Sequence, residues 1–200
     1  MKSELELLVE EGYVTNPDSA RGRLLVKAAH LFKKKGYERT TVRDLANEVG
    51  IQSGSIFHHF KTKEEILKAV MEEAIRYNTA RMIRALKKSD STKEKLLELI
   101  KCELTSITGF TGEAMTVLVY EWRSLTEESQ AHILSLRDIY EKLWIDVLNE
   151  AKDEGLVSGD TFILRRFLTG ALSWTTTWFD EHGGMTLDEL AEQALLLAVK

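Results

Sequence analysis

The sequence predicts an all-α protein, and three observations lead to that prediction. The 200 residues include one proline and 12 glycines, too few chain-breaking residues for an all-β fold with many turns. Apolar residues recur at spacings of three and four along most of the chain, which is the period of an amphipathic helix. Capping residues and glycines stand between these stretches, where helices begin and end. The pattern indicates nine helices and no strand.

The first 63 residues divide into a tail and three short helices. Residues 1–17 hold the only proline and are expected to be partly ordered at best. Thr41 is placed to cap a helix, and Gly36 and Gly50 follow the last turns of the helices before them. The helices expected in this part cover residues 20–35, 42–49 and 54–60.

Six further helices follow, most of them marked by a capping residue at the start or a glycine at the end. Thr62, with Glu65 three residues later, has the capping-box pattern, and Thr186 with Glu189 repeats it before the last helix. The six helices are expected over residues 63–88, 92–108, 113–124, 127–154, 160–181 and from 187 onward.

Charge is distributed unevenly along the chain. The net charge is −5 and the pI about 5.6, which argues against nucleic-acid binding when the chain is taken whole. Residues 1–18, 19–63 and 64–200 carry −4, +7 and −8, respectively. The basic segment is typical of a site for a polyanion, although a solvated helix surface gives the same pattern. We expect a tail over 1–17, a DNA-binding domain over 18–63 and a second domain over 64–200.

Several classes of function are not favoured by the sequence. The single cysteine, Cys102, rules out an intrachain disulfide, and the N-terminal residues lack the apolar core of a secretory signal. No apolar run is long enough to span a bilayer. There is no phosphate-binding glycine loop, paired metal motif or nucleophile elbow, and the adjacent His58 and His59 point about 100° apart on a helix. We expect a cytoplasmic protein that is not an enzyme and has no cofactor, metal or membrane partner.

The second and third expected helices form a helix-turn-helix pattern. Ala46 is small enough for the third helix to cross closely, and Gly50 permits a left-handed turn. Ile51 is expected to plug the turn into the core, with Ile56 and Phe60 anchoring the third helix. The side chains left to face outward, suited to a DNA major groove, are Gln52, Ser53, Ser55, Phe57, His58 and His59. The flanking residues suited to phosphate contacts are Thr40, Thr41, Lys61 and Lys63.

The run TTVRDLANEVGIQSGSIFHHFKTKEEIL resembles the DNA-binding module of the TetR family of bacterial transcriptional regulators, and LFKKKGYERTTV resembles its lead-in. The resemblance implies a homodimer with recognition helices about 34 Å apart that binds a roughly palindromic double-stranded operator. It assigns base or phosphate contacts to Gln52, Ser53, Ser55 and His58, and backbone positioning to Thr41, Phe57, His59 and Lys63. The family commonly has Tyr where this chain has Phe57, so a hydroxyl contact to phosphate is lost there.

Two C-terminal runs, VYEWRSLTEESQAHILSLRDIYEKLW and RRFLTGALSWTTTWFDEHGGMTLDELAE, resemble a TetR subgroup that senses acyl-CoA thioesters and controls lipid or sterol catabolism. The resemblance implies a repressor released from DNA by acyl-CoA or a fatty acid derivative. Candidate apolar and aromatic residues for the effector site are Met82, Leu86, Phe110, Met115, Leu118, Tyr120, Trp122, Tyr140, Trp144, Trp174 and Trp178. Candidate cations for the CoA phosphates are Arg123, Arg137, Arg165 and Arg166.

Alternatives remain open at this point. Each aromatic residue is also explained by core packing, and each arginine by surface ion pairs. A TetR-type regulator of another response, such as drug efflux, fits the same residues. A helical enzyme acting on acyl thioesters and a helical adaptor protein fit them less well. The last two helices are expected to form the dimer interface, with an apolar stripe of Leu187, Leu190, Ala191, Ala194, Leu195 and Ala198.

Overall fold

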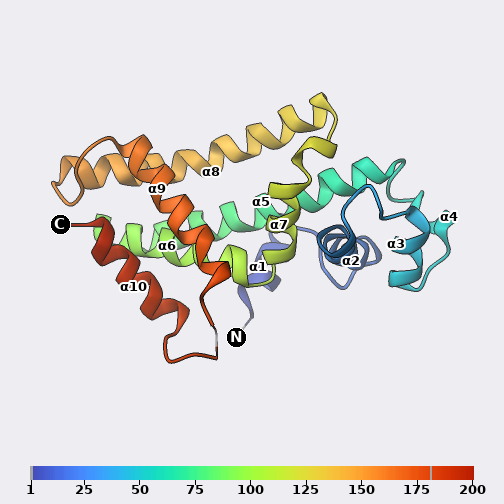
Figure 1. Cartoon of the computed structure of the whole chain (residues 1–200), viewed down its shortest axis with the longest axis horizontal. Helices are drawn as coiled ribbons and strands as arrows, with labels where there is room; N and C mark the ends of the chain where they lie inside the picture. The colour runs from blue at the N-terminus through green and yellow to red at the C-terminus, as the bar shows by residue number, and fades with distance from the viewer. Residues whose placement is uncertain (1, 181) are drawn as a thin grey trace. The chain divides into compact units, whose positions relative to one another are not determined.

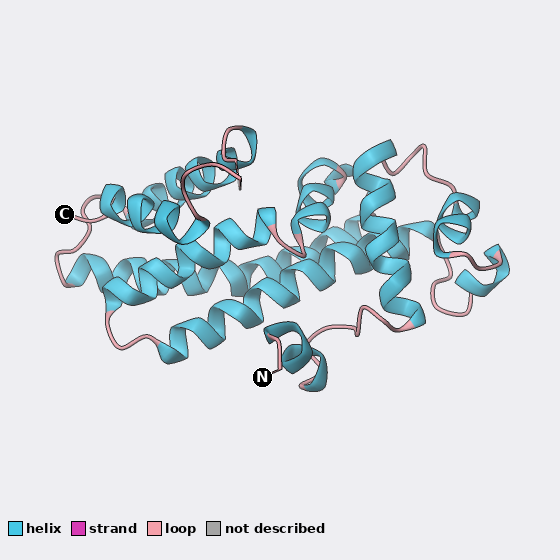
Figure 2. Ribbon diagram, turned by 90° about the horizontal axis from the view of Figure 1, so that it is seen from below, coloured by secondary structure: helices cyan, strands magenta, loops and turns pink. Residues whose placement is uncertain are grey.

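The computed structural model describes residues 2–180 and 182–200, and all regular structure within these ranges is helical (Figure 1, Figure 2). This confirms the predicted all-α class. The α-helices of the described ranges are α1 (Glu4–Glu10), α2 (Ala20–Lys35), α3 (Val42–Val49), α4 (Ser53–Ile56), α5 (Lys63–Lys88), α6 (Thr92–Thr108), α7 (Gly112–Tyr120), α8 (Glu127–Asp153), α9 (Thr161–Trp174) and α10 (Leu187–Ala198). Two 3-10 turns are η1 (Trp122–Ser124) and η2 (Thr175–Thr177).

The chain forms two compact units, each assembled from two separate stretches of sequence. The first unit combines Met1–Tyr77 with Thr111–Arg137, and the second combines Asn78–Phe110 with Asp138–Lys200. The long helices α5 and α8 therefore contribute residues to both units. The domains expected over 18–63 and 64–200 are assigned by function and not by packing. The assignment of DNA binding to the first and of a separate function to the second stays a prediction.

The core of the first unit is formed where α2 packs against α3 and α7. Residues on α2 that recur at helical spacing are buried, including Leu24, Ala28 and Phe32. Leu45 on α3 and Ile56 on α4 are buried in the same cluster. This packing supports the short α3 and α4, which are too short to be stable as isolated helices.

The core of the second unit is built around α6, which packs against α9 and α10. Leu99 and Ile100 on α6 are fully buried, as is Trp144 on α8. Leu172 on α9 and Leu195 on α10 complete the cluster. All the helices of this unit thus present one apolar face to a shared interior.

Most helix starts agree with the sequence prediction because their signals are local. Ser19 caps α2, and the Thr186–Glu189 capping box at the start of α10 is present with both hydrogen bonds. The Thr62 hydroxyl accepts a hydrogen bond from the Glu65 N–H at 3.1 Å. The Glu65 carboxylate, however, accepts from the N–H of Lys61 and so closes a slightly wider loop.

The expectation of a partly ordered tail is wrong, since residues 4–10 form α1. A capping box of Ser3 and Glu6 opens this helix, and Leu8 is fully buried. The Thr15 N–H donates to the Glu73 carboxylate on α5 at 2.9 Å, and the Thr15 hydroxyl bonds to the same carboxylate. A tertiary contact 58 residues away along the chain thus holds the segment that follows α1.

Three expected helices are shorter than predicted. The helix expected over residues 54–60 is α-helical only over 53–56, and i→i+3 hydrogen bonds continue it as turns to His59. The helix expected over 113–124 ends at Tyr120, and the 3-10 turn η1 follows it. The helix expected to reach residue 181 ends at Trp174. Residue 181 itself lies outside the described residues.

A substitution at Gly22 tests the close packing of α2 on the segment before it. A Cβ atom at Gly22 would lie 2.0 Å from the Asn16 carbonyl oxygen and 2.7 Å from the Pro17 Cα. Both are backbone atoms, so Gly22→Ala is expected to destabilise the fold by about 1–3 kcal/mol. Urea unfolding measures the change. Gly54→Ala is the matched control, since nothing lies within 4 Å of its Cβ position, and it should not destabilise.

Candidate functional site

The N-terminus of α3 is fixed by a reciprocal capping box. The Thr41 hydroxyl accepts from the Asp44 N–H at 3.1 Å, and an Asp44 carboxylate oxygen accepts from the Thr41 N–H and hydroxyl, both at 2.8 Å. These hydrogen bonds from Thr41 lower the pKa of the Asp44 carboxyl. The Asp44 carboxylate therefore keeps its charge to lower pH than an ordinary aspartate, and α3 keeps its cap.

The turn between α3 and α4 is a Schellman motif centred on Gly50. Gly50 has φ +77° and ψ +34°, a left-handed conformation that residues with a Cβ adopt at a cost. The N–H groups of Ile51 and Gly50 donate to the carbonyl oxygens of Ala46 and Asn47 at 2.9 and 3.2 Å. Ile51 is 38% exposed, so the expectation that it plugs the turn into the core is wrong.

The segment that follows the turn is anchored from inside and presents polar and aromatic groups outside. Ile56 and Phe60 are buried in the first unit's core, as expected. Phe57 is 54% exposed, which leaves its ring available at the surface. The structure brings the predicted contact residues onto this segment, with Gln52, His58 and His59 exposed and Ser53 and Ser55 half-buried. Their role as DNA contacts stays a prediction.

Thr40 does not belong to this surface. Its side chain is fully buried, and its hydroxyl donates to the Gly36 carbonyl oxygen at 2.8 Å. A hydroxyl that satisfies a buried carbonyl cannot reach a phosphate, so Thr40 is withdrawn from the contact set. Two exposed basic residues lie beside the motif, Lys61 after it and Arg43 on α3. Nothing local in the sequence indicates which way Arg43 points, so the sequence alone does not single it out.

Lys63 is partly buried and engaged within the protein. Its ammonium donates to the Tyr37 carbonyl oxygen at 2.8 Å and lies 4.0 Å from the centre of the Tyr37 ring. Burial raises the pKa of the Tyr37 hydroxyl, and the negative charges of Glu64, Glu38 and Glu121 raise it further. The Lys63 ammonium is therefore already bound to Tyr37, and a contact with a DNA phosphate would have to compete with this interaction.

In the second unit, Arg165 lies in a buried polar cluster with Glu103, Glu141, Tyr140 and Trp144. Its guanidinium is 1% exposed and bonds to the Glu103 carboxylate at 3.3 Å and to the Glu141 carboxylate at 3.1 and 3.2 Å. The Tyr140 hydroxyl and the Trp144 ring N–H donate to the same Glu103 oxygen at 2.9 and 3.1 Å. Burial is the main cause that raises the pKa of Tyr140 well above its ordinary value.

This cluster brings together three of the predicted effector residues but changes the role of one. Arg165 faces two carboxylates and stacks 4.4 Å from the Trp144 ring, so it is not available to pair with CoA phosphates. One guanidinium nitrogen, Nη1, is buried without a hydrogen-bond partner. The cluster thus contains two carboxyl groups around one guanidinium.

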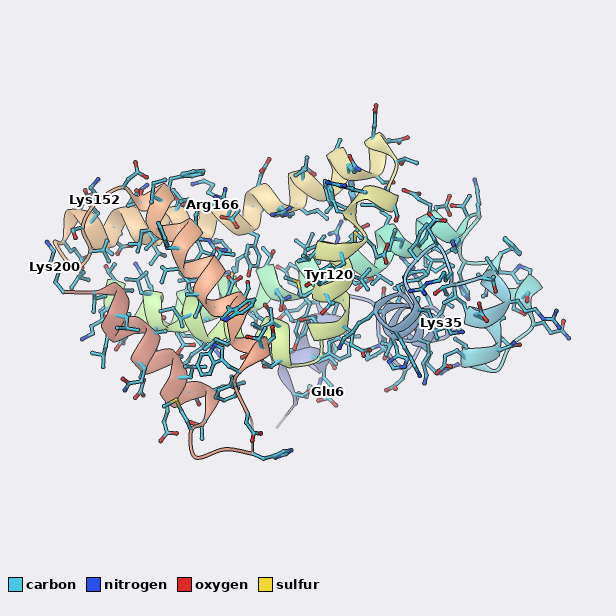
Figure 3. The ribbon with its side chains drawn as sticks, in the orientation of Figure 1. Glu6, Lys35, Tyr120, Lys152, Arg166 and Lys200 are labelled. Atoms are coloured by element: carbon cyan, nitrogen blue, oxygen red, sulfur yellow. The ribbon has the colours of Figure 1, made fainter. Side chains whose placement is uncertain are left out.

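The other predicted effector residues belong to both units, some in the cores and some on the surface. Met115, Leu118 and Trp122 pack in or against the first unit's core, whereas Met82 and Leu86 do so in the second unit. Several are on the surface, where Tyr120 is 79% exposed and Trp174 66% exposed. Figure 3 labels Tyr120, the last residue of α7. The remaining exposed members are Phe110, Arg123, Arg137, Arg166 and Trp178.

The exposed face of α9 carries a row of large apolar side chains. Ile163, Phe167 and Trp174 stand at helical spacing on this face, with Trp178 beyond it, and each is at least half exposed. The apolar stripe on α10, expected at a dimer interface, faces the core of the second unit. Its residues are buried or packed in the subunit's own core, and α10 instead exposes Leu196 and Leu197.

The fold and the α3–turn–α4 geometry define a helix-turn-helix DNA-binding protein. Two family models match the chain, "Bacterial regulatory proteins, tetR family" over residues 24–70 and "Tetracyclin repressor-like, C-terminal domain" over residues 89–200. The chain therefore belongs to the TetR family of bacterial regulators, which confirms the resemblance found in its sequence. No helix among the described residues is long and apolar enough to cross a membrane.

Individual relatives cover nearly the whole chain. HTH-type transcriptional repressor KstR2 of Mycobacterium tuberculosis is 29% identical over 187 residues, 91% of this chain and 92% of that protein. The solved structure of this ketosteroid transcriptional regulator covers 94% of this chain and 99% of its own, with a TM-score of 0.81 at 27% identity. The chain thus resembles the lipid- and sterol-catabolism regulators, as its C-terminal runs indicate.

Two further solved structures share the fold. That of superantigen pfit is 61% identical and covers 98% of both chains, with a TM-score of 0.88. That of AibR in complex with isovaleryl coenzyme A and operator DNA is 20% identical, with a TM-score of 0.80, and covers 90% of this chain and 98% of that one. The AibR likeness is one of fold.

The buried cluster makes a sharp stability prediction. Arg165→Met leaves the Glu103 carboxylate buried without its cation, so we expect a loss of about 3–5 kcal/mol in unfolding free energy. Lys142→Met is the matched control, because Lys142 pairs with Asp146 on the exposed surface of α8 and its loss should cost at most about 0.5 kcal/mol. Equal effects of the two variants in urea unfolding would contradict the assigned role of Arg165.

Proposed function

We propose that this chain is a transcriptional repressor that binds a palindromic operator as a homodimer and is released by a hydrophobic effector. One observation carries the proposal. The segment after the Gly50 turn is polar and exposed, and it lies within the basic residues 19–63 of a chain of the TetR family. Such a segment fits the major groove of B-DNA. The protein acts in the cytoplasm, where the DNA lies, and needs no cofactor and no membrane.

The proposed DNA contacts divide into those that distinguish bases and those that hold phosphates. Gln52, Ser53, Ser55 and His58 are assigned to base edges or phosphates, and Gln52 has the amide that pairs with adenine. Thr41, Phe57 and His59 position the backbone, helped by the exposed Arg43 and Lys61. Phe57 contributes ring packing only, because it has no hydroxyl.

The homodimer is proposed to form through the exposed row on α9 together with the outer face of α10. Single exposed apolar residues are ordinary, but a row that includes Phe167 and Trp174 is typical of an interaction face. A two-fold axis relates the two half-sites of a palindromic operator, so a symmetric dimer suits such a site.

The proposed effector is an acyl-CoA or a related fatty acid or sterol derivative. The names of KstR2, a ketosteroid regulator, and of AibR, solved with isovaleryl coenzyme A, support this class. The unpartnered Nη1 of Arg165 suits a neutral carbonyl such as that of a thioester. The phosphates of CoA are then left to exposed arginines, of which Arg123, Arg137 and Arg166 are the candidates.

A second candidate function comes from superantigen pfit, because 61% identity over 98% of both chains is a close relationship. Stimulation of T cells by the purified chain is its test, and a positive result is compatible with DNA binding. A drug-like effector fits the same fold. Homologues that are transcriptional regulators give no support to an acyl-thioester hydrolase.

Selection from a pool of random duplexes tests DNA recognition. The wild-type chain should enrich a palindromic site, and Gln52→Ala should weaken binding by about 1–3 kcal/mol with relaxed specificity at one position of each half-site. Fluorescence anisotropy on the selected duplex and its single-base variants measures both effects. If no palindrome is enriched, the proposed function fails.

Addition of acyl-CoA to the complex tests release. Saturating palmitoyl-CoA or isovaleryl-CoA should weaken binding of the selected duplex at least fivefold, and the duplex should weaken binding of that acyl-CoA by the same factor. Titration calorimetry in both orders checks this reciprocity, with free CoA as the control. The acyl-CoA assignment is contradicted if neither compound shifts the affinity for DNA.

A further inference from the structure

The backbone of Tyr37 is held from two sides by side chains that come from distant parts of the chain. The Tyr37 N–H donates to a carboxylate oxygen of Glu121 at 3.0 Å. The Tyr37 carbonyl oxygen accepts from the Lys63 ammonium at 2.8 Å. Glu121 follows α7 and Lys63 begins α5, so 84 and 26 residues separate them from Tyr37. All three residues lie in the first compact unit.

The side chain of Tyr37 is fixed as firmly as its backbone. Its ring lies edge-on to the Phe32 ring of α2, with the ring centres 5.4 Å apart. The Lys63 ammonium covers the ring at 4.0 Å, and Tyr37 as a whole is buried. The same lysine thus engages both the carbonyl oxygen and the ring of one residue.

The hydrogen bonds of Glu121 and Lys63 to Tyr37 are called the clamp here. Tyr37 lies in the loop that sets the position of α3. The loop runs from Gly36, which ends α2, to Thr41, which caps α3. The Thr40 N–H donates to the same Tyr37 carbonyl oxygen at 3.1 Å, and the Thr40 hydroxyl donates to the Gly36 carbonyl oxygen. The clamp and these bonds leave the loop little freedom, so the direction in which α3 starts depends on them.

Glu121 is itself held in place. Its second carboxylate oxygen accepts from the Ser124 hydroxyl at 3.2 Å, within the turn η1. Its first oxygen lies 3.5 Å from the Cβ position of Gly36, a residue with φ +84°. Glu121 also belongs to the segment matched by the C-terminal family model, whereas Tyr37 and Lys63 belong to the N-terminal one. The clamp therefore ties the two family segments together at one residue.

We propose that Lys63 and Glu121 are positioning residues that clamp Tyr37 and thereby set the direction of α3 and α4 for operator binding. Lys63 acts on the protein backbone instead of on a DNA phosphate. Because Glu121 directly follows α7 as its C-cap, a displacement of α7 acts on the loop before α3 through this hydrogen bond. The inference rests on the proposed DNA-binding function, which it deepens by naming the residues that orient the motif.

The salt dependence of DNA binding separates a positioning lysine from a phosphate contact. Lys63→Met and Glu121→Ala are each expected to weaken binding of the selected palindromic duplex about tenfold. The slope of log K against log salt should stay at the wild-type value for both variants, since no phosphate contact is removed. Lys61→Met is the matched control. It removes an exposed cation next to the motif and should reduce the slope by about 0.9.

Amide hydrogen exchange without DNA tests the clamp on its own. Exchange over residues 37–41 should be at least tenfold faster in Lys63→Met and Glu121→Ala than in the wild type or Lys61→Met, with the core of α5 unchanged as a sign of intact folding. Glu121→Gln keeps an acceptor oxygen and should restore slow exchange.

The outcomes distinguish the clamp from the proposed function. A reduced salt slope in Lys63→Met equal to that of Lys61→Met overturns the positioning role. Unchanged exchange over residues 37–41 in both clamp variants overturns the clamp. If selection enriches no duplex, the proposed function fails, and the exchange measurement still decides whether Tyr37 is held as described.

Discussion

The left-handed turn at Gly50 is the constraint on which the exposed recognition segment depends. A residue with a Cβ in this conformation costs about 1–2 kcal/mol, so glycine is the residue that makes the reversal inexpensive. The turn directs Ile56 and Phe60 into the core, and the side chains between and around them are thereby left outside. The capping box of Thr41 and Asp44 fixes the other end of α3, so both ends of this helix are determined by local hydrogen bonds.

Local signals explain how much of the fold could be predicted from the sequence. The starts of α2, α3 and α10 follow from caps formed by residues three apart, and the ends of α2 and α3 follow from glycines. The start of α1 also has a local signal, the Ser3–Glu6 capping box, but the order of the whole segment depends on the burial of Leu8 and on the Thr15–Glu73 hydrogen bonds to α5, which leave no local pattern. The same reason hides the clamp on Tyr37.

The burial and the partners of the predicted effector residues could not be predicted from the sequence. Helical spacing puts Trp174 and Phe167 on one face of α9, but it does not say whether that face is buried or exposed. An arginine in the sequence is equally a phosphate ligand or half of an ion pair. For Arg165 the deciding partner, Glu103, lies 62 residues away. Which side of a helix is buried and which distant charges pair are properties of the packed structure, and they change the role of Arg165.

In the proposed dimer, the apolar row on α9 links the stability of the protein to its concentration. Apolar rings that a second copy covers in the proposed dimer are left in water when the copies separate, so association and folding are linked by mass action. At low concentration the separated chain exposes this apolar surface, and proteases and chaperones act on that separated form. In the proposed dimer, dilution therefore lowers the stability of each copy as well as the number of copies.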